Sequence, residues 1–223
     1  MTDQEPQANR ALARLLAQRY AQALRDADSV AAEEAIEVAL QAGFDGAAIC
    51  SRVIAPAMRW IGDLWEGDSM SVADEHLATA MTHHLLGRLQ ASLFPPPHRT
   101  EAATALLACA EGEQHTLGLS MIADVLHSRG WRVLELGASV PTEALVAALD
   151  RHSPHLVGFS ATMSWSIPSL VRALERIAEA QPRARVILGG NGIPVRLRET
   201  HPWASEVEEA VHLVDDPAAI VAA

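Results

Sequence analysis

The sequence has few basic residues, and it has no hydrophobic run long enough to span a membrane. Its 17 lysine and arginine residues stand against 28 acidic residues, which gives a net charge of −11 with histidine counted as neutral. This balance argues against binding to nucleic-acid phosphates or anionic membranes, because both depend on basic side chains. No apolar run reaches about 18 residues, and no secretion signal opens the chain. We therefore expect a cytoplasmic protein.

Cysteines and closely spaced glycines are also scarce. Cys50 and Cys109 lie in apolar stretches without metal-site spacing, which predicts reduced thiols in the protein core. A dinucleotide-binding loop requires Gly-x-Gly-x-x-Gly, but only Gly112 and Gly118 follow the first predicted strand. This pattern disfavours a nicotinamide-dependent enzyme. The chain also lacks a nucleophile elbow and a phosphate loop.

The first part of the chain, residues 1–95, has apolar residues at helical spacing. Helices are predicted around residues 12–16 and 35–40, and over residues 45–64 and 71–94. Together they predict a four-helix bundle, in which we expect Trp60 to pack inside and Pro56 to kink the third helix. The run Phe94-Pro-Pro-Pro97 cannot continue a helix and is predicted to be the domain boundary.

The second part, residues 101–223, alternates between apolar strand-length runs and helical segments. Strands are predicted at residues 103–110, 131–136, 155–160 and 184–188, with helices over residues 116–129 and 141–150. This alternation predicts an α/β domain with a doubly wound, Rossmann-like parallel sheet. Ligands of such sheets bind at the carboxyl ends of the strands, so the loops there are where we expect the binding site.

The loop after the first of these strands carries Glu113-x-His115-x-x-Gly118. A carboxylate two residues before a histidine can accept one ring N–H, which fixes the tautomer and makes the other nitrogen a better metal ligand. A glycine three residues later lets a bulky group approach the backbone at the start of the helix.

This loop resembles the Asp/Glu-x-His-x-x-Gly motif of proteins that bind cobalamin with its benzimidazole tail displaced from cobalt. The resemblance implies that His115 is the lower axial ligand of cobalt, and that the tail inserts into the α/β domain near Gly118. Family segments that line the tail correspond to Ser160, Thr162, Gly189 and Gly190. The alternative is that His115 is a solvated loop histidine and that Gly189-Gly190 is an ordinary turn.

A second motif, Trp65-x9-Glu75-His76, precedes this domain. It resembles cobalamin-dependent photoreceptors, in which a helical bundle covers the upper face of adenosylcobalamin. The resemblance implies that Trp65 stacks beside the adenosyl group and that Glu75 and His76 contact it. The alternative is that Trp65 belongs to the bundle core and that Glu75 and His76 are surface residues. Some relatives have a histidine directly after the tryptophan, where this chain has Glu66.

DNA-regulating members of that group carry a helix-turn-helix domain, whereas only residues 1–9 precede the first predicted helix here. The arrangement resembles the stand-alone photocobilins, which bind a bilin such as biliverdin beside cobalamin. His83 and His84 are the candidates for a bilin contact, although they also suit a polar seam in the bundle. A zinc site from His76 and His83 lacks a recognisable third ligand.

The leading functional hypothesis is a light sensor rather than an enzyme, in which photolysis of the Co–C bond changes domain or subunit packing. A homo-oligomer, with a dimer favoured, and an unidentified downstream protein are the expected partners besides cobalamin. The alternative is a corrinoid carrier subunit that supplies methyl groups to a methyltransferase. An adenosyl pocket needs the Trp65 motif, whereas a methyl carrier must keep that face accessible.

Overall fold

The computed structural model describes residues 7–95, 103–180, 185–193 and 204–206. The chain divides into two compact units, Met1–Pro95 and Pro96–Ala223. The division falls within the proline run that the sequence analysis takes as the boundary. In the part of the chain that the structure describes, no helix is both long and apolar enough to cross a membrane.

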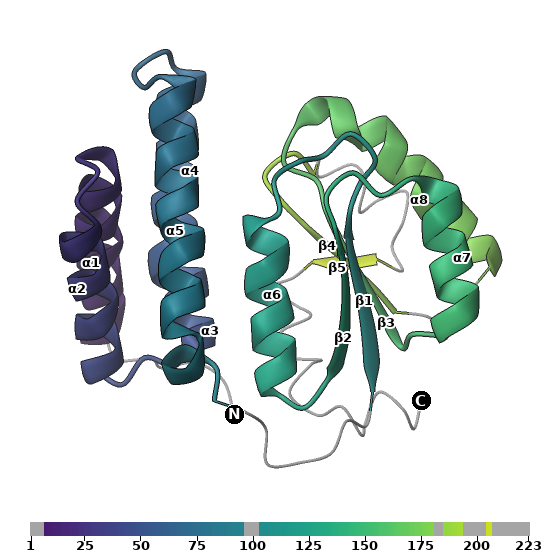
Figure 1. Cartoon of the computed structure of the whole chain (residues 1–223), viewed down its shortest axis with the longest axis horizontal. Helices are drawn as coiled ribbons and strands as arrows, with labels where there is room; N and C mark the ends of the chain where they lie inside the picture. The colour runs from purple at the N-terminus through teal and green to yellow at the C-terminus, as the bar shows by residue number, and fades with distance from the viewer. Residues whose placement is uncertain (1–6, 96–102, 181–184, 194–203, 207–223) are drawn as a thin grey trace. The chain divides into compact units, whose positions relative to one another are not determined.

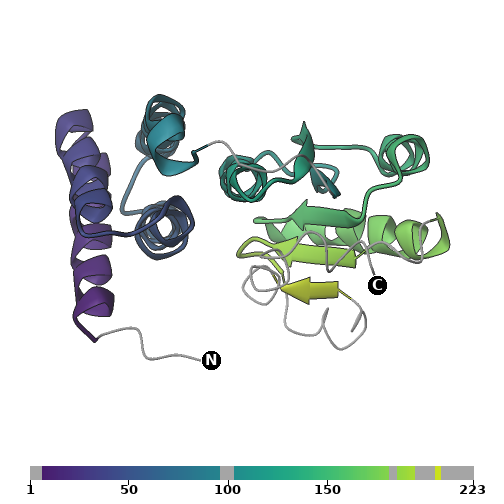
Figure 2. The same cartoon turned by 90° about the horizontal axis from the view of Figure 1, so that it is seen from below.

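The first unit is helical (Figure 1). Its elements are α1 (Gln7–Arg25), α2 (Ser29–Gln41), α3 (Gly46–Ile49), a π-helical turn (Cys50–Ile54), α4 (Ala55–Glu66) and α5 (Val72–Leu93). In Figure 2, α1 and α2 form one layer and α4 and α5 form the other. The helical domain predicted from the apolar spacing is thereby confirmed.

The irregularity predicted at Pro56 takes the form of the π-helical turn. Proline has no N–H to donate, and its ring crowds the carbonyl four residues earlier. The turn just before it is widened, so that the N–H of Ala55 bonds to the carbonyl of Cys50, five residues back. Helical structure therefore continues from α3 through the π-helical turn into α4, with no residue between them.

The capping signals operate as expected, but one core prediction is wrong. Ser71 Oγ accepts a hydrogen bond from the Asp74 N–H, which caps α5. Trp60, expected inside the bundle, is 37% exposed. It lies on the outward side of α4, whereas Ala57 and Ile61 on the same helix are buried. Helical spacing identified a wider apolar stripe than the bundle covers.

The second unit is a parallel sheet with helices on both faces (Figure 1). Its elements are β1 (Thr104–Cys109), α6 (Leu117–Ser128), β2 (Arg132–Gly137), α7 (Thr142–His152), β3 (Leu156–Ser160), a 3-10 turn (Ser164–Ser166), α8 (Ile167–Ala180), β4 (Arg185–Gly189) and β5 (Ala204–Glu206). The strand order is β2-β1-β3-β4-β5. The doubly wound fold is confirmed, and the sequence analysis missed the three-residue β5.

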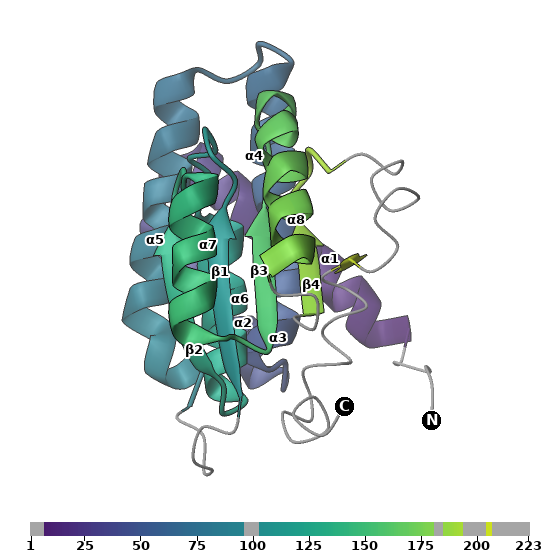
Figure 3. The same cartoon turned by 90° about the vertical axis from the view of Figure 1, so that its right-hand side faces the viewer.

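Strand β1 lies inside this sheet and is buried on both faces. Leu106 and Ala108 pack under α7 and α8, the face seen in Figure 3. Leu107 and Cys109 point to the other face, where they join a cluster with Trp131 and α6. Burial on both sides explains why the strand is a continuous apolar run rather than an alternating one. Both cysteines are buried thiols, as predicted.

The order β2-β1-β3 places the point where the chain reverses its winding between β1 and β3. Chain connections leave these two strands toward opposite faces, and ligands of such sheets bind at the carboxyl ends of the strands at this point. The loops that begin at Ala110 and Ala161 lie there. The first of these loops carries the predicted histidine motif.

A buried hydrogen-bond chain links α1 to α5 in the helical unit. The hydroxyl of fully buried Tyr20 donates to Thr82 Oγ1 (3.0 Å), which itself bonds to the carbonyl of Ala78 (2.9 Å). Thr82→Ala leaves the Tyr20 hydroxyl buried without this partner and is expected to cost about 2 kcal/mol. Tyr20→Phe leaves Thr82 bonded to Ala78 and is expected to cost less than about 1 kcal/mol from the lost bond. Urea unfolding of the full chain measures both, and equal costs would contradict the prediction.

Candidate cobalamin site

A buried carboxylate organises the loop after β1. The backbone of Glu113 is part of a tight turn, in which its N–H donates to the carbonyl of Ala110 (2.9 Å). Its side chain is 0% exposed. Oxygen Oε1 accepts hydrogen bonds from the backbone N–H groups of Gln114 (3.0 Å) and His115 (3.1 Å), and from His115 Nδ1 (2.5 Å). One oxygen atom therefore fixes both the backbone and the ring of the histidine.

The second carboxylate oxygen binds the loop after β3. Glu113 Oε2 accepts from the backbone N–H groups of Thr162 (2.6 Å) and Met163 (2.9 Å). The buried hydroxyl of Ser166 lies 3.1 Å from the same oxygen. The single side chain of Glu113 thus joins the loops at the carboxyl ends of two neighbouring strands.

These donors determine the charge of Glu113. Burial by itself raises the pKa of this carboxyl, but hydrogen bonds from the His115 ring and from the N–H groups of Met163, His115 and Thr162 favour its ionised form. Their combined effect lowers the pKa from 4.5 to about 2. Glu113 is therefore a carboxylate at neutral pH despite its complete burial.

An ionised Glu113 also sets the tautomer of His115. A carboxylate only accepts hydrogen bonds, so the neutral ring must carry its proton on Nδ1. Nε2 then has the lone pair, which is the form of imidazole that coordinates a metal. The His115 side chain is 44% exposed, so the ring extends out of the loop while its anchor is buried. A single histidine held this way fits a cobalt ion that the corrin ring already surrounds.

Gly118 leaves room next to this histidine. It is exposed in the first turn of α6, and a Cβ atom built on it would meet no other atom within 4 Å. The glycine is therefore not required by packing within the chain. The open space beside it fits the passage of a bulky ligand group, as expected from the motif.

The remaining predicted tail-lining residues come together at the ends of β3 and β4. Ser160 pairs with Gly189 in the sheet, and the N–H of Ala161 donates to the Gly189 carbonyl (2.9 Å). Gly190 has φ +108°, and a Cβ atom there would lie 2.4 Å from the Ala161 carbonyl oxygen. Gly190 thus allows the two loops to approach each other closely. Thr162 is the next residue along, and its N–H is bound to Glu113.

Trp65, Glu75 and His76 lie on either side of the loop between α4 and α5. Trp65 is half-buried in the last turn of α4. Glu75 is in the first turn of α5, where its carboxylate accepts from Thr79 Oγ1 (2.9 Å) and lies 2.6 Å from His76 Nδ1. The side chain of Glu75 is 15% exposed and that of His76 is 75% exposed. The Glu75 carboxylate is thus fixed by hydrogen bonds, whereas the imidazole of His76 faces outward.

His83 and His84 lie further along α5, half-buried and exposed respectively. Among the described residues, no group of three or more His, Cys, Asp or Glu side chains could hold a metal ion. The structure therefore adds no third ligand to His76 and His83. Their assignment to a bilin stays a prediction.

The sequence analysis missed Ser166 as a support of Glu113. Ser166 is fully buried in the 3-10 turn before α8, and it reaches Glu113 from 53 residues away. A lone serine in a loop carries no sequence signal of such a role. Only its position after the β3 loop, facing the predicted site, could have drawn attention to it.

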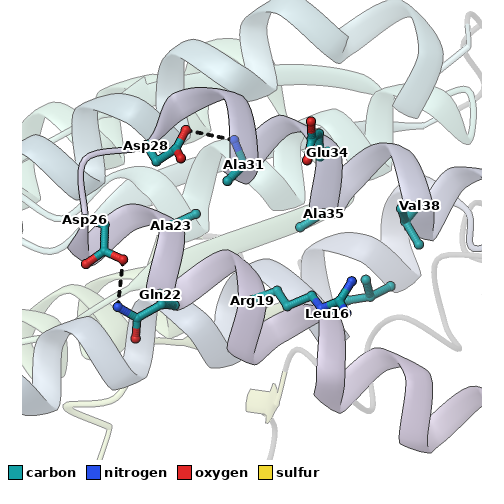
Figure 4. A pocket seen from close by; sticks show the side chains of 10 residues that line it. All are labelled: Leu16, Arg19, Gln22, Ala23, Asp26, Asp28, Ala31, Glu34, Ala35 and Val38. Carbon is teal, nitrogen blue, oxygen red and sulfur yellow. Dashed lines mark hydrogen bonds between the residues drawn. The ribbon is translucent and has the colours of Figure 1, made fainter.

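A surface pocket of about 300 Å³ lies elsewhere, between α1 and α2 of the helical unit (Figure 4). Asp28 and Asp26 lie at one end, bonded to the Ala31 N–H and to Gln22. Asp28 caps α2, so its carboxylate is used in the fold. None of the predicted site residues lines this pocket.

The depressed pKa of Glu113 predicts an acid-sensitive stability. Because the folded-state pKa of about 2 lies below the unfolded value, the unfolded state binds more protons between these limits. About 3 kcal/mol of stability, fully present above pH 5, is expected to disappear as the pH falls from about 4.5 to 2. Urea unfolding midpoints at a series of pH values measure this loss.

Glu113→Gln is expected to be less stable at neutral pH and to lack this part of the pH dependence. Glu111→Gln, which changes an exposed carboxylate in the same loop, is the matched control and should keep the wild-type profile. A Glu113→Gln variant with the wild-type slope between pH 4.5 and 2 would contradict the role assigned to this carboxylate.

Comparison with known proteins finds B12 binding domains in both parts of the chain. Residues 103–208 match a model of the B12 binding domain, and residues 16–90 match a second B12 binding domain model. The chain is 30% identical over 170 residues to the HTH-type transcriptional repressor CarA of Myxococcus xanthus. That match covers 76% of this chain and 56% of the repressor, so the chain spans little more than half of that relative.

Corrinoid proteins are similar over more of their length. Trimethylamine corrinoid protein 1 of Methanosarcina acetivorans is 25% identical over 186 residues, which cover 83% of this chain and 84% of that protein. The solved structure of the Methanosarcina barkeri monomethylamine corrinoid protein has the same fold. Its TM-score is 0.75 at 20% identity, over 93% of this chain and 98% of that one. With B12 binding domain matches in both of its parts, this chain is a cobalamin-binding protein.

Proposed function

We propose that the chain is a light sensor that binds adenosylcobalamin, with His115 as the lower ligand of cobalt. The observation that carries the cobalamin site is the His115 ring, bonded through Nδ1 to a fully buried Glu113 carboxylate. Visible light breaks the Co–C bond of adenosylcobalamin, which is the chemistry that the cofactor supplies. The chain's own residues bind the cofactor and respond to the change.

In the α/β unit, Glu113 would keep Nε2 of His115 as the nitrogen that coordinates cobalt. A carboxylate partner also makes the imidazole more basic and so a stronger ligand. In the same proposal, Gly118 and the loops after β3 and β4 would hold the nucleotide tail. The residues that line it are Ser160, Thr162, Gly189 and Gly190.

On the helical unit, Trp65, Glu75 and His76 would be the residues that contact the adenosyl group. The indole of Trp65 is a flat apolar surface that excludes water from the Co–C bond. The carboxylate of Glu75, already held by Thr79, accepts hydrogen bonds from ribose hydroxyls. Glu66 follows Trp65, so a histidine at that position does not replace the lost upper ligand after illumination.

The signal in this proposal is a change in packing. Trp65, Glu75 and His76 would lose a contact surface when the adenosyl group leaves, and the helical unit would then change its association. A second copy of the chain or a downstream protein reads that change, as expected when a ligand distinguishes two states. The chain itself is not an enzyme in this scheme.

A bilin is a separate part of the proposal. His83 and His84 are its candidate contacts on α5. Noncovalent binding is expected, because both cysteines are buried.

A second candidate function is a corrinoid carrier for a methyltransferase. Its support is the similarity to trimethylamine corrinoid protein 1, which extends over 84% of that protein and includes both parts of this chain. In such a carrier His115 and Glu113 would tune the reactivity of cobalt. The Trp65-x9-Glu75-His76 motif favours the light sensor.

The light-sensor proposal predicts a cofactor that responds to light through Trp65. Absorption spectra and size-exclusion profiles of the adenosylcobalamin complex should change after green light. Trp65→Ala is expected to weaken adenosylcobalamin binding by about tenfold, from the loss of one stacked aromatic contact, and to abolish the light-dependent size change. Trp60→Ala, on the same helix and 37% exposed, is the matched control and should behave as wild type.

His115→Ala is expected to lose the histidine-coordinated cobalamin spectrum altogether. Photolysis with no change in molecular size would argue against the light sensor. Methyl transfer from a methylated donor to the reduced cobalamin protein would then favour the carrier. A red absorption band that appears on addition of biliverdin, is shifted from that of free bilin, and is removed by His83→Ala would support the bilin contact.

A further inference from the structure

The turn after β2 supports the histidine loop from the side opposite to β3. Strands β1 and β2 pair in register up to Leu107 and Glu135, but the next pair is Ala108 with Gly137. This β-bulge passes over Leu136, which is 40% exposed. A bulge bends a strand and redirects the residues that follow it. Here it directs residues 138–140 toward the loop that carries Glu113 and His115.

The backbone of this turn is held in an uncommon conformation. Gly137 has φ +80° and Ser139 has φ +48°. Serine rarely adopts the left-handed region, because its Cβ atom crowds the backbone there. Such a conformation persists where surrounding contacts require it, and it often occurs at functional sites.

Two hydrogen bonds explain what holds Ser139 in place. Its Oγ accepts from the N–H of Gly112 (3.0 Å), and its own N–H donates to the carbonyl of Glu113 (2.8 Å). A third bond, from the N–H of Val140 to the carbonyl of Cys109 (3.2 Å), continues the attachment to the end of β1. Ser139 therefore binds the main chain on both sides of the Glu113 Cα atom.

This contact complements the contacts of the Glu113 side chain. Thr162, Met163 and Ser166 fix the carboxylate from the β3 side, but they do not fix the main chain from which it extends. Ser139 fixes that main chain from the β2 side. With both ends held, Glu113 presents the His115 ring in one position.

We propose that Ser139 is a positioning residue for cobalt coordination, acting on His115 through Gly112 and Glu113. The inference rests on the proposed role of His115 as the lower cobalt ligand. The positioning role predicts that substitution of Ser139 affects folding stability and cobalt coordination by His115 differently. Ser139→Gly relieves the positive φ and should leave the folded state as stable or more stable, yet it should loosen the histidine loop. A purely structural serine would instead change both in the same direction.

The test compares Ser139→Ala and Ser139→Gly with Ser153→Ala. Ser153 is the matched control, because it is also a serine with positive φ (+43°) but ends α7, where its N–H bonds to the carbonyl of Leu149. It precedes β3, at the amino end of the parallel strands, whereas the histidine loop lies at their carboxyl end. Substituting alanine leaves the same strained backbone at both positions and removes one hydroxyl.

The first readout needs no cofactor. In cobalamin-free protein, amide hydrogen exchange of Gly112 should quicken by about fivefold in Ser139→Ala, the effect of losing one hydrogen bond. Ser153→Ala should leave it unchanged.

The second readout is electron paramagnetic resonance of bound cobalamin reduced to the Co(II) state, in which a nitrogen ligand splits the cobalt signal. The histidine-coordinated fraction should fall at least about twofold in both Ser139 variants.

The outcomes separate this inference from the proposed function. If wild type shows nitrogen coordination and the Ser139 variants match Ser153→Ala, Ser139 does not position the histidine, while His115 remains the ligand. If wild-type protein binds cobalamin without a nitrogen ligand, His115 is not the lower ligand, and the inference fails with it. The positioning role would also be overturned if Ser139→Gly lowered the free energy of unfolding together with the histidine-coordinated fraction, because general destabilisation would then explain the lost coordination.

Discussion

The proposed cobalamin site depends on one ion inside the protein, the carboxylate of Glu113. Burial of a charge is unfavourable unless hydrogen bonds replace its water. Here backbone N–H groups, a serine hydroxyl and the His115 ring replace it, and the pKa of the carboxyl stays near 2. Because these donors come from two different loops, the charge is stable only when both loops are correctly folded. The position of His115 therefore depends on the hydrogen bonds that stabilise the Glu113 carboxylate.

The sheet topology explains why the donors meet at this point. Strands β1 and β3 are neighbours but are separated in sequence by β2 and two helices. Their carboxyl ends lie side by side, so Glu113 and Met163 come within 2.9 Å despite a separation of 50 residues. The bulge that ends β2 brings Ser139 to the same loop from the other side. The loops that follow β1, β2 and β3 thus all help to hold His115 in position.

The helical unit presents a different kind of constraint. Glu75 is held on its own helix by Thr79 and His76, through contacts of one to four residues in sequence. Such local contacts follow from helical spacing alone. The loop between α4 and α5 then keeps Trp65 close to this pair along the chain. The arrangement of Glu75 and His76 on the helical unit is therefore encoded locally, whereas the loop that carries His115 requires the assembled sheet.

The sequence by itself determined the fold class, the buried cysteines and the Glu113-x-His115-x-x-Gly118 loop, because period, capping and short spacings are local properties of a chain. It misplaced Trp60, since an apolar position on a helix is buried only where a neighbour covers it. It could not identify Ser166 or Ser139 as supports of Glu113, nor the three-residue β5. Only the tertiary structure decided these features, because strand order and register bring together residues that are far apart in the sequence.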